Sequence, residues 1–282
     1  LPLYIEGSLK AATFEVEGNI SSQFITGLLY TVPLLDGDSE IVIKGALESK
    51  GYVDLTLKIL EMAGIEVKNN DYKSFLIKGN QTYKGFDYTV EGDYSQVAFW
   101  IVAGILSEEI NCKNVYKDSL QGDRAIVEIV QRMGANLEIN DKNIKVFPGK
   151  TKGTVIDVSQ CPDIAPVLTV LAALSEGETR IINAERLRIK ESDRITSMRT
   201  ELNKLGADIR EEGDTLVING VDELEGGVTV DSWNDHRVAM ALAIASIKCK
   251  NPILITDAGA VRKSYPNFWN DFVSMGGKVG EI

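Results

Sequence analysis

Apolar residues recur every three or four positions in four segments of the chain, and this spacing predicts four amphipathic helices. The predicted helices end near Met62, Met133, Leu205 and Met275, which follow one another at intervals of 71, 72 and 70 residues. A glycine stands one or two positions after each of these ends and suits the left-handed position that terminates a helix. The chain therefore contains an internal repeat of about seventy residues.

A second helix is predicted roughly half a period before each amphipathic one. These helices open on capping-type residues near Ser21, Tyr94, Pro162 and Asn234. The residues that follow are apolar on almost every side, most clearly over 165–174. Because a helix without a polar face must be buried, each repeat is predicted to enclose one helix and to expose the polar face of the other.

Short runs rich in β-branched residues fill the gaps between the helices, for example at 41–43, 180–182 and 215–218. Read from Val155, one repeat runs strand, helix, strand, helix, strand, strand. We therefore predict an α/β protein built of βαβαββ repeats. Residues 1–91 should form one domain with about one repeat plus leading strands, and residues 92–282 a second domain with three repeats.

Composition narrows the kind of partner. The 282 residues are 44% hydrophobic, and the formal net charge is −11, which argues against nucleic acid or an anionic membrane as the main partner. A small anionic substrate needs only a local basic pocket. No apolar run is long enough to cross a bilayer. Three scattered cysteines without metal-ligand spacing, and no signal-peptide pattern, indicate the cytoplasm.

The most distinctive stretch chemically is 188–194, which has five charged residues and one serine in seven positions. Lys190 and Arg194 stand four apart where a helix is predicted to begin, so they should repel each other by ~0.2–0.5 kcal/mol and oppose the helix dipole. A bound anion would remove both costs, because backbone N–H groups also point outward there. The alternative is a solvated, charged helix entry.

Two loop positions in each repeat gather polar residues. The mouths of the predicted buried helices hold Ser21, Ser22, Gln23, Asp163, Asp235, His236 and Arg237. The loops before the amphipathic helices hold Ser49, Lys50, Tyr52, Lys190, Glu191, Arg194, Arg262 and Lys263. Each has an ordinary reading: the serines and Asp163 as helix caps, the single histidine as a structural residue, Tyr52 as packing, and Arg262 and Lys263 as solvated surface.

Taken together these residues predict a site. Four cations of an otherwise acidic chain lie in these loops, namely Lys190, Arg194, Arg237 and Lys263. Asp163 and Glu191 lie in comparable loops. This set suits a doubly anionic substrate with acid–base chemistry close by. The sequence has no glycine-rich phosphate loop, no zinc-type spacing and no catalytic serine–histidine–aspartate order. We accordingly expect neither a metal nor a cofactor.

At these residues the chain resembles the 5-enolpyruvylshikimate-3-phosphate synthase family along its whole length. The resemblance rests on seven motifs in order, of which the lysine–glutamate–serine–aspartate–arginine run is the most specific. The motifs are Gly18–Phe24, Ser49–Asp54, Glu91–Asp93, Gln121–Asp123, Arg188–Arg194, Asn234–Arg237 and Arg262–Pro266. The family fold consists of two inside-out α/β barrels, each of three βαβαββ units.

The resemblance implies transfer of an enolpyruvyl group from phosphoenolpyruvate to the 5-hydroxyl of shikimate 3-phosphate, with release of phosphate, in the glyphosate-sensitive step of aromatic amino-acid biosynthesis. It implies that shikimate 3-phosphate binds to Ser21, Ser22, Gln23, Ser49, Tyr52, Asp163 and Lys190. It implies that phosphoenolpyruvate binds to Gln23, Arg194, Arg237 and Lys263. The catalytic residues would be Asp163, Glu191, Lys263 and His236, with Asp163 as the base near the attacking hydroxyl.

The chain departs from the family in length and at one position. Six repeats are expected and about four are present, so roughly the first third is missing, together with its lysine–serine and arginine segments. Arg186 stands where some members have an asparagine, and it is left out of the site. We therefore expect the chain alone to be nearly inactive, and its incomplete first domain to favour self-association although the family is usually monomeric.

Two other functions fit parts of the pattern. The sister enolpyruvyl transferase that acts on UDP-N-acetylglucosamine shares the fold, but it should not need the Ser21, Ser22 and Ser49 set. A non-catalytic repeat scaffold would bind protein partners and have no affinity for small phosphorylated anions.

Overall fold

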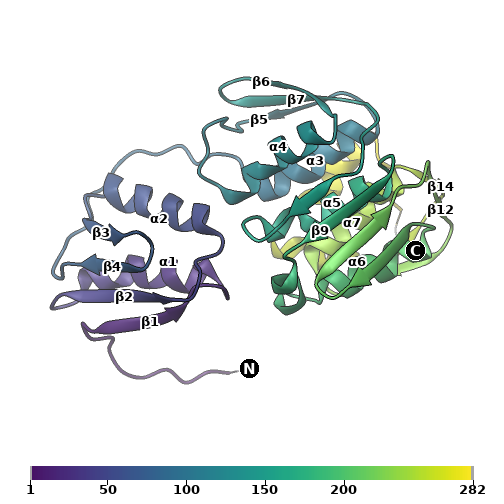
Figure 1. Cartoon of the computed structure of the whole chain (residues 1–282). Helices are drawn as coiled ribbons and strands as arrows, with labels where there is room; N and C mark the ends of the chain where they lie inside the picture. The colour runs from purple at the N-terminus through teal and green to yellow at the C-terminus, as the bar shows by residue number, and fades with distance from the viewer. Residues whose placement is uncertain (1, 281–282) are drawn as a thin grey trace. The chain divides into compact units, whose positions relative to one another are not determined.

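A computed structural model describes residues 2–280, which divide into two compact units. Of these residues, unit 1 comprises 2–90 and 120–122, and unit 2 comprises 91–119 and 123–280. Figure 1 shows the elements of each unit along the colour gradient of the chain. Among the described residues no helix is both long and apolar enough to cross a membrane.

Unit 1 is a single βαβαββ module. Its elements in chain order are β1 (Thr13–Glu17), α1 (Ser22–Thr31), the 3-10 helix η1 (Val32–Leu34), β2 (Ser39–Lys44), α2 (Lys50–Met62), β3 (Val67–Asn70) and β4 (Ser74–Ile77). The sheet order is β1-β2-β4-β3, in which β1 and β2 are parallel and the other neighbours are antiparallel. Residues of α1, β2, α2 and β4 form one apolar core.

The middle of unit 2 repeats this module with the same strand order. Its elements are β8 (Val155–Asp157), the 3-10 helix η3 (Pro162–Ile164), α5 (Ala165–Ala173), β9 (Glu178–Ile182), the 3-10 helix η4 (Glu185–Ile189), α6 (Arg194–Lys204), β10 (Asp208–Glu212) and β11 (Thr215–Asn219). The sheet order β8-β9-β11-β10 again starts with a parallel pair and continues with two antiparallel pairs. The predicted α/β class and the order read from Val155 are confirmed.

The flanking parts of unit 2 are variations on the module. Before it come α3 (Tyr94–Leu106), β5 (Ile110–Lys113), the 3-10 helix η2 (Gly122–Arg124, of which Gly122 belongs to unit 1), α4 (Ala125–Arg132), β6 (Asn136–Ile139) and β7 (Asn143–Phe147). After it come β12 (Leu224–Gly226), β13 (Thr229–Asp231), α7 (His236–Ser246), β14 (Cys249–Asn251), β15 (Leu254–Thr256), the 3-10 helix η5 (Ala258–Lys263) and α8 (Phe268–Ser274). Strands β5, β7 and β6 form an antiparallel sheet, while β12–β14 and β13–β15 are two separate parallel pairs.

A glycine stands where the last strands of unit 2 divide into two pairs. Gly226 ends β12 with φ +66, and a Cβ at this position would lie 2.2 Å from the backbone oxygen of Asn251. Only glycine allows both the left-handed conformation and the close approach to β14.

The four glycines predicted to end the amphipathic helices all have positive φ angles. The values are 76° at Gly64, 96° at Gly134, 100° at Gly206 and 95° at Gly276. After α2 the Gly64 amide bonds to the Glu61 oxygen, and the next amide reaches back to Leu60. These bonds satisfy carbonyls that the helix end would otherwise leave without a partner. The repeat of about seventy residues in the sequence therefore corresponds to four helices that end at a glycine with positive φ.

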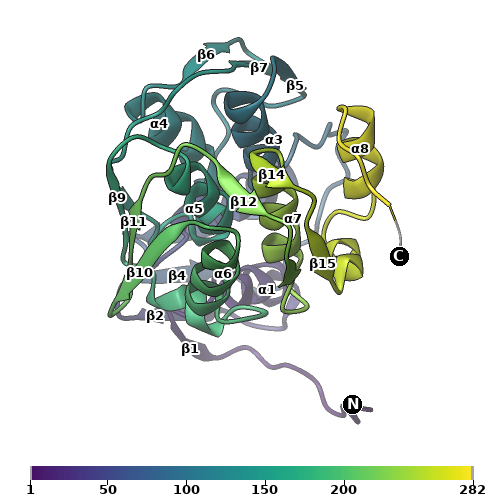
Figure 2. The same cartoon turned by 90° about the vertical axis from the view of Figure 1, so that its right-hand side faces the viewer.

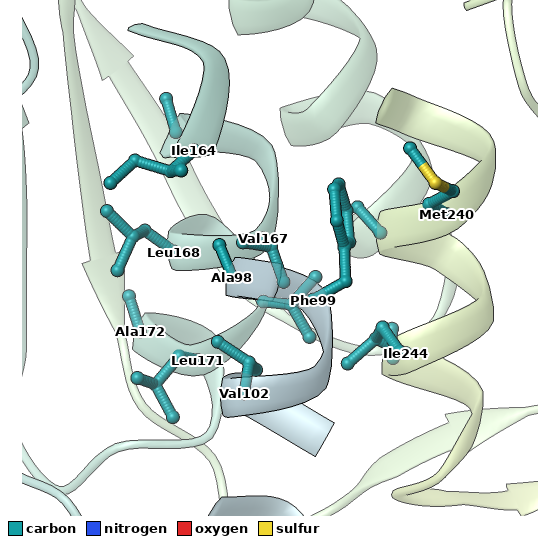
Figure 3. Packing of buried hydrophobic residues seen from close by; sticks show 14 of the residues in the cluster. Ala98, Phe99, Val102, Ile164, Val167, Leu168, Leu171, Ala172, Met240 and Ile244 are labelled. Carbon is teal, nitrogen blue, oxygen red and sulfur yellow. The ribbon is translucent and has the colours of Figure 1, made fainter. Parts of the chain in front are cut away.

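The interior of unit 2 is formed by α3, α5 and α7, which are apolar on nearly every face and buried along most of their length. Figure 2 shows strands β5, β6 and β7, and strands β9, β11 and β10, outside these helices. In Figure 3, Phe99 and Val102 of α3, Val167 of α5 and Ile244 of α7 point toward one another. Burial of such side chains contributes roughly 1.5–3 kcal/mol each.

The equivalent helix of unit 1 is only half buried, which corrects the prediction that every such helix is enclosed. Ile25 and Leu29 of α1 are inaccessible to solvent, but the side of the helix that bears Phe24 is open and Phe24 is 60% exposed. The reason is structural. Within unit 1, α1 has no second and third helix of its own kind to pack against, whereas α3, α5 and α7 cover one another.

Candidate functional site

Three pairs of parallel strands deliver the predicted site residues. The carboxyl ends of two parallel neighbours lie at the same edge of a sheet, so the loops that follow them emerge together. In unit 2, Asp163 follows β8 and Lys190 follows β9, while Asp235 follows β13 and Lys263 follows β15. In unit 1 the loops after β1 and β2 are related in the same way.

Arg194 is the centre of the site in unit 2. It is the first residue of α6, only 1% of its surface is exposed, and it donates hydrogen bonds to three carboxylates. Its Nη1 lies 2.9 Å from Asp163 Oδ1, its Nε 2.9 Å from Asp235 Oδ2 and its Nη2 2.6 Å from Glu191 Oε2. A buried guanidinium is stable only when paired in this way.

Asp163 forms ion pairs with three cations. Arg194, Arg237 and Lys190 lie 2.9, 3.3 and 3.5 Å from its carboxylate oxygens. Burial alone would raise the pKa of Asp163, but the charges of Arg237, Lys190 and Arg194 outweigh burial and hold that pKa well below its usual range. Asp163 is therefore ionised at neutral pH. It does not cap a helix, because α5 begins two residues later without a side-chain cap.

Six residues thus form what we call the charge cluster: Asp163, Lys190, Glu191, Arg194, Asp235 and Arg237. It contains three cations and three carboxylates, so its formal charges cancel. Lys190 precedes α6 in extended backbone rather than sharing a helical turn with Arg194, which corrects the expected repulsion between the two. The anions that stabilise these cations are the protein's own side chains.

His236 and Lys263 adjoin the cluster. His236 Nδ1 lies 3.8 Å from Glu191 Oε1, is buried, and has no hydrogen-bond partner among residues 2–280. Burial, followed by the nearby Arg237 charge, lowers the pKa of His236, so its ring is neutral at pH 7. Lys263 ends η5, and its Nζ donates to the backbone oxygen of Asn234, the residue before Asp235. The structure therefore brings together all seven predicted residues of unit 2.

Two carboxylates of the cluster and the adjoining His236 form a trio that has the composition of a metal site. Potential ligand atoms of Glu191, Asp235 and His236 lie within 4.8 Å of one another. Arg194, however, already binds Glu191 Oε2 and both oxygens of Asp235. A divalent cation here would lie beside a buried guanidinium, whose charge opposes it, so we assign no metal to the trio.

Unit 1 holds the other predicted residues at the mouths of its two helices. Ser21 caps α1 and accepts a hydrogen bond from the Gln23 amide at 3.3 Å, as predicted. Ser49 precedes α2 in the left-handed region with φ 53 and is buried, with Tyr52 in the first turn. The two loops touch, because the Glu48 amide donates to the Gly18 oxygen at 3.1 Å. Ser21, Ser22, Gln23, Ser49 and Tyr52 thus share one edge of the sheet.

Two residues of the unit 2 site had no assigned role in the sequence analysis. Asp235 is fully buried, caps α7 through the Arg237 amide and binds Arg194. Ser95 accepts hydrogen bonds from the Arg237 guanidinium at its hydroxyl, at 3.0 Å, and at its backbone carbonyl, at 3.3 Å. The cap position of Asp235 was visible in the sequence, but its contact with a residue forty-one positions earlier was not.

The fold defines a class. A solved structure titled EPSP synthase from Acinetobacter baumannii superimposes with a TM-score of 0.80 at 26% identity, covering 95% of this chain and 63% of that one. A second structure from the same organism gives a TM-score of 0.79 at 24% identity. The repeated βαβαββ architecture is therefore that of the enolpyruvyl transferases.

Sequence comparison then specifies the family. The pattern of the EPSP synthase (3-phosphoshikimate 1-carboxyvinyltransferase) family matches residues 1–272, and the chain belongs to this family. Relatives described as 3-phosphoshikimate 1-carboxyvinyltransferase are 57% identical in Clostridium novyi (strain NT) and 59% identical in Clostridium perfringens (strain 13 / Type A). The chain is covered completely by both but spans only 64% and 66% of their lengths.

Proposed function

We propose that this chain serves the transfer of the enolpyruvyl group from phosphoenolpyruvate to the 5-hydroxyl of shikimate 3-phosphate, with release of inorganic phosphate. The observation that carries the proposal is the convergence of Lys190, Arg194 and Arg237 on Asp163. Both proposed substrates carry phosphate and carboxylate groups, which such cations recognise.

The reaction needs one base and one acid in each of two steps. In the addition, the 5-hydroxyl oxygen forms a bond to C2 of phosphoenolpyruvate, the hydroxyl proton leaves, and a proton is added to the C3 methylene. In the elimination, C3 loses a proton and the C2–O bond to phosphate breaks. We assign Asp163 to the hydroxyl proton, and Glu191, Lys263 and His236 to protons at C3 and on the leaving phosphate.

Substrate binding would itself adjust the base. Asp163 is a poor proton acceptor while three cations lower its pKa. When substrate phosphate and carboxylate groups pair with Lys190, Arg194 and Arg237, these cations interact less strongly with Asp163, and its pKa rises toward the ordinary value. For Arg194 to contact phosphoenolpyruvate, Glu191 must leave Nη2, and its half-exposed side chain permits this movement. Glu191 would then be released for proton transfer at the moment the substrate binds.

The unit 1 residues are assigned to shikimate 3-phosphate. Ser21, Ser22, Gln23, Ser49 and Tyr52 offer hydroxyl, amide and ring surfaces at one sheet edge of unit 1, and the proposal also assigns Asp163 and Lys190 of unit 2 to this substrate. Phosphoenolpyruvate is assigned to Arg237, Lys263 and Arg194, helped by Gln23. No metal or cofactor takes part in this scheme.

The test is calorimetry of the whole chain with each substrate, followed by a phosphate-release assay with both. We expect binding of shikimate 3-phosphate and of phosphoenolpyruvate, and at least a tenfold loss of phosphoenolpyruvate affinity in Arg237→Gln. UDP-N-acetylglucosamine is the control ligand and should not bind. Turnover by the chain alone should be far below that of a relative of full family length. Absence of heat with either substrate, or tighter binding of the UDP-sugar, would overturn the proposal.

We also infer a cytoplasmic location, which is supported by the three cysteines, since all are free thiols. Self-association through the open side of α1 is the accompanying expectation for the oligomeric state. Analytical ultracentrifugation over a hundredfold concentration range checks it, and a constant monomer mass would rule it out.

A further inference from the structure

Glu201 is a buried carboxylate for which neither the proposed reaction nor the charge cluster accounts. It lies on α6 and only 1% of its surface is exposed. Its Oε2 accepts hydrogen bonds from Lys204 Nζ at 2.7 Å and the Asp231 amide at 3.0 Å, and its Oε1 accepts from Trp233 Nε1 at 2.9 Å. A buried charge with this many donors is costly to replace by a neutral group of the same size.

Glu201 and Arg194 hold the two ends of one loop. They stand seven positions apart on α6, which is two helical turns, so they share a face of the helix. Arg194 binds Asp235 at 2.9 Å, while Glu201 binds the Asp231 amide and the Trp233 ring. The loop 231–235 is thus fastened to α6 at both ends.

The loop needs such fastening because its backbone is strained. Trp233 and Asn234 have φ angles of 53° and 50°, two consecutive non-glycine residues in the left-handed region. A non-glycine residue keeps this conformation only when the surrounding structure holds it there. The strained turn points the Asn234 carbonyl at Lys263 and places Asp235 against Arg194 and the Arg237 amide.

We propose that Glu201 is a positioning residue for phosphoenolpyruvate. Through Trp233 and Asp231 it fixes the turn that orients Lys263 and the start of α7, and so it sets the affinity for this substrate without touching it. The inference rests on the proposed function. The carboxylate is specifically required, because a glutamine offers one acceptor oxygen and turns an N–H toward a second N–H donor.

The experiment compares four forms of the full chain: wild type, Glu201→Gln, Trp233→Phe and Lys204→Gln. Lys204→Gln is the matched control, because it removes the half-exposed cation but leaves both hydrogen bonds from the loop. Phosphoenolpyruvate affinity should fall about tenfold in Glu201→Gln and severalfold in Trp233→Phe. It should change less than twofold in Lys204→Gln, as should shikimate 3-phosphate affinity in all three variants.

Two further readouts do not depend on the proposed function. The chain has three indoles, and Trp100 and Trp269 donate to the Tyr265 hydroxyl and the Ala258 carbonyl. Only the third indole N–H signal in a ¹⁵N NMR spectrum, that of Trp233, should move in Glu201→Gln. The rate at which acetic anhydride acetylates Lys263, monitored by mass spectrometry, should rise severalfold in Glu201→Gln and in Trp233→Phe.

The outcomes separate the two ideas. If wild type does not bind phosphoenolpyruvate, the proposed function fails, and the Lys263 acetylation rates alone decide whether Glu201 positions the loop. If wild type binds and Glu201→Gln binds within twofold of it, positioning by Glu201 is refuted and the proposed function stands. Unchanged acetylation of Lys263 in Trp233→Phe overturns the inference as well, even if Glu201→Gln fails to fold.

Discussion

Asp163→Asn tests how the charge cluster is stabilised. The replacement keeps the size of the side chain but removes one of three carboxylates, so the formal charge of the cluster rises from zero to +1. Arg237 then keeps its hydrogen bonds to Ser95 but loses the negative charge of Asp163, and Lys190 loses the same charge. Removing one partner of a buried ion pair costs about 3–5 kcal/mol. Because the Asp163 side chain is 27% exposed and asparagine keeps one acceptor oxygen, we expect the lower end, about 3 kcal/mol.

The assay is urea unfolding followed by tryptophan fluorescence. All three tryptophans, Trp100, Trp233 and Trp269, belong to unit 2, so the signal reports the unit that contains the change. The control is Asp141→Asn, which removes an exposed partner of Lys117 and should leave the urea midpoint of unit 2 essentially unchanged, because solvent screens an exposed ion pair.

The same unfolding experiment, repeated at several pH values and with added phosphate, gives two further tests of how Asp163 stabilises the cluster. The folded-state pKa of Asp163 lies below its unfolded value, so the stability it contributes is fully present above the unfolded pKa and is lost as the pH falls through the folded one. The difference between wild type and variant should therefore be constant from pH 6 to 8 and shrink only in acid. Inorganic phosphate should stabilise Asp163→Asn more than wild type, because it supplies the missing anion. Equal stability at pH 7, or no selective gain from phosphate, would refute the electrostatic account.

Three further predictions concern the fold. Gly226→Ala should destabilise unit 2 by about 1–3 kcal/mol more than Gly213→Ala in urea unfolding, because both glycines have positive φ but only the first faces a backbone oxygen of β14 at 2.2 Å. Ile25→Ala should cost roughly 2–5 kcal/mol and Phe24→Ala less than about 1 kcal/mol, measured by hydrogen exchange of unit 1, and equal losses would show that α1 is covered on both sides. Burial raises the pKa of Cys112 to about 12, so this thiol should react with Ellman's reagent at pH 8 at least a hundredfold faster after unfolding in urea than before.

Local periodicity was sufficient to predict the elements of this fold. The four terminating glycines, the buried character of α3, α5 and α7 and the sequence of strands and helices along one repeat all depend on residues close together in the chain. Glycine positions and the spacing of apolar residues determine these features, and both can be read directly from the sequence.

Long-range contacts account for what the sequence did not reveal. The partners of Arg194 come from three separate loops, and nothing in the spacing of Lys190 and Arg194 distinguishes internal carboxylates from a bound substrate as the neutralising anion. The exposure of Phe24 depends on how many equivalent helices share its unit, which its own segment does not encode. The role of Glu201 was hidden because a glutamate in an amphipathic helix ordinarily faces water.

The sharing of one interior by α3, α5 and α7 has a consequence for folding. Each strand pairing in the middle module closes within 65 residues of chain, from Val155 to Asn219, so the sheet itself is a local structure. The interior is not local, because its helices come from three consecutive modules and each loses its apolar neighbours if any one is unravelled. Unit 2 should therefore melt in a single cooperative step, unlike an open array of repeats that frays from its ends.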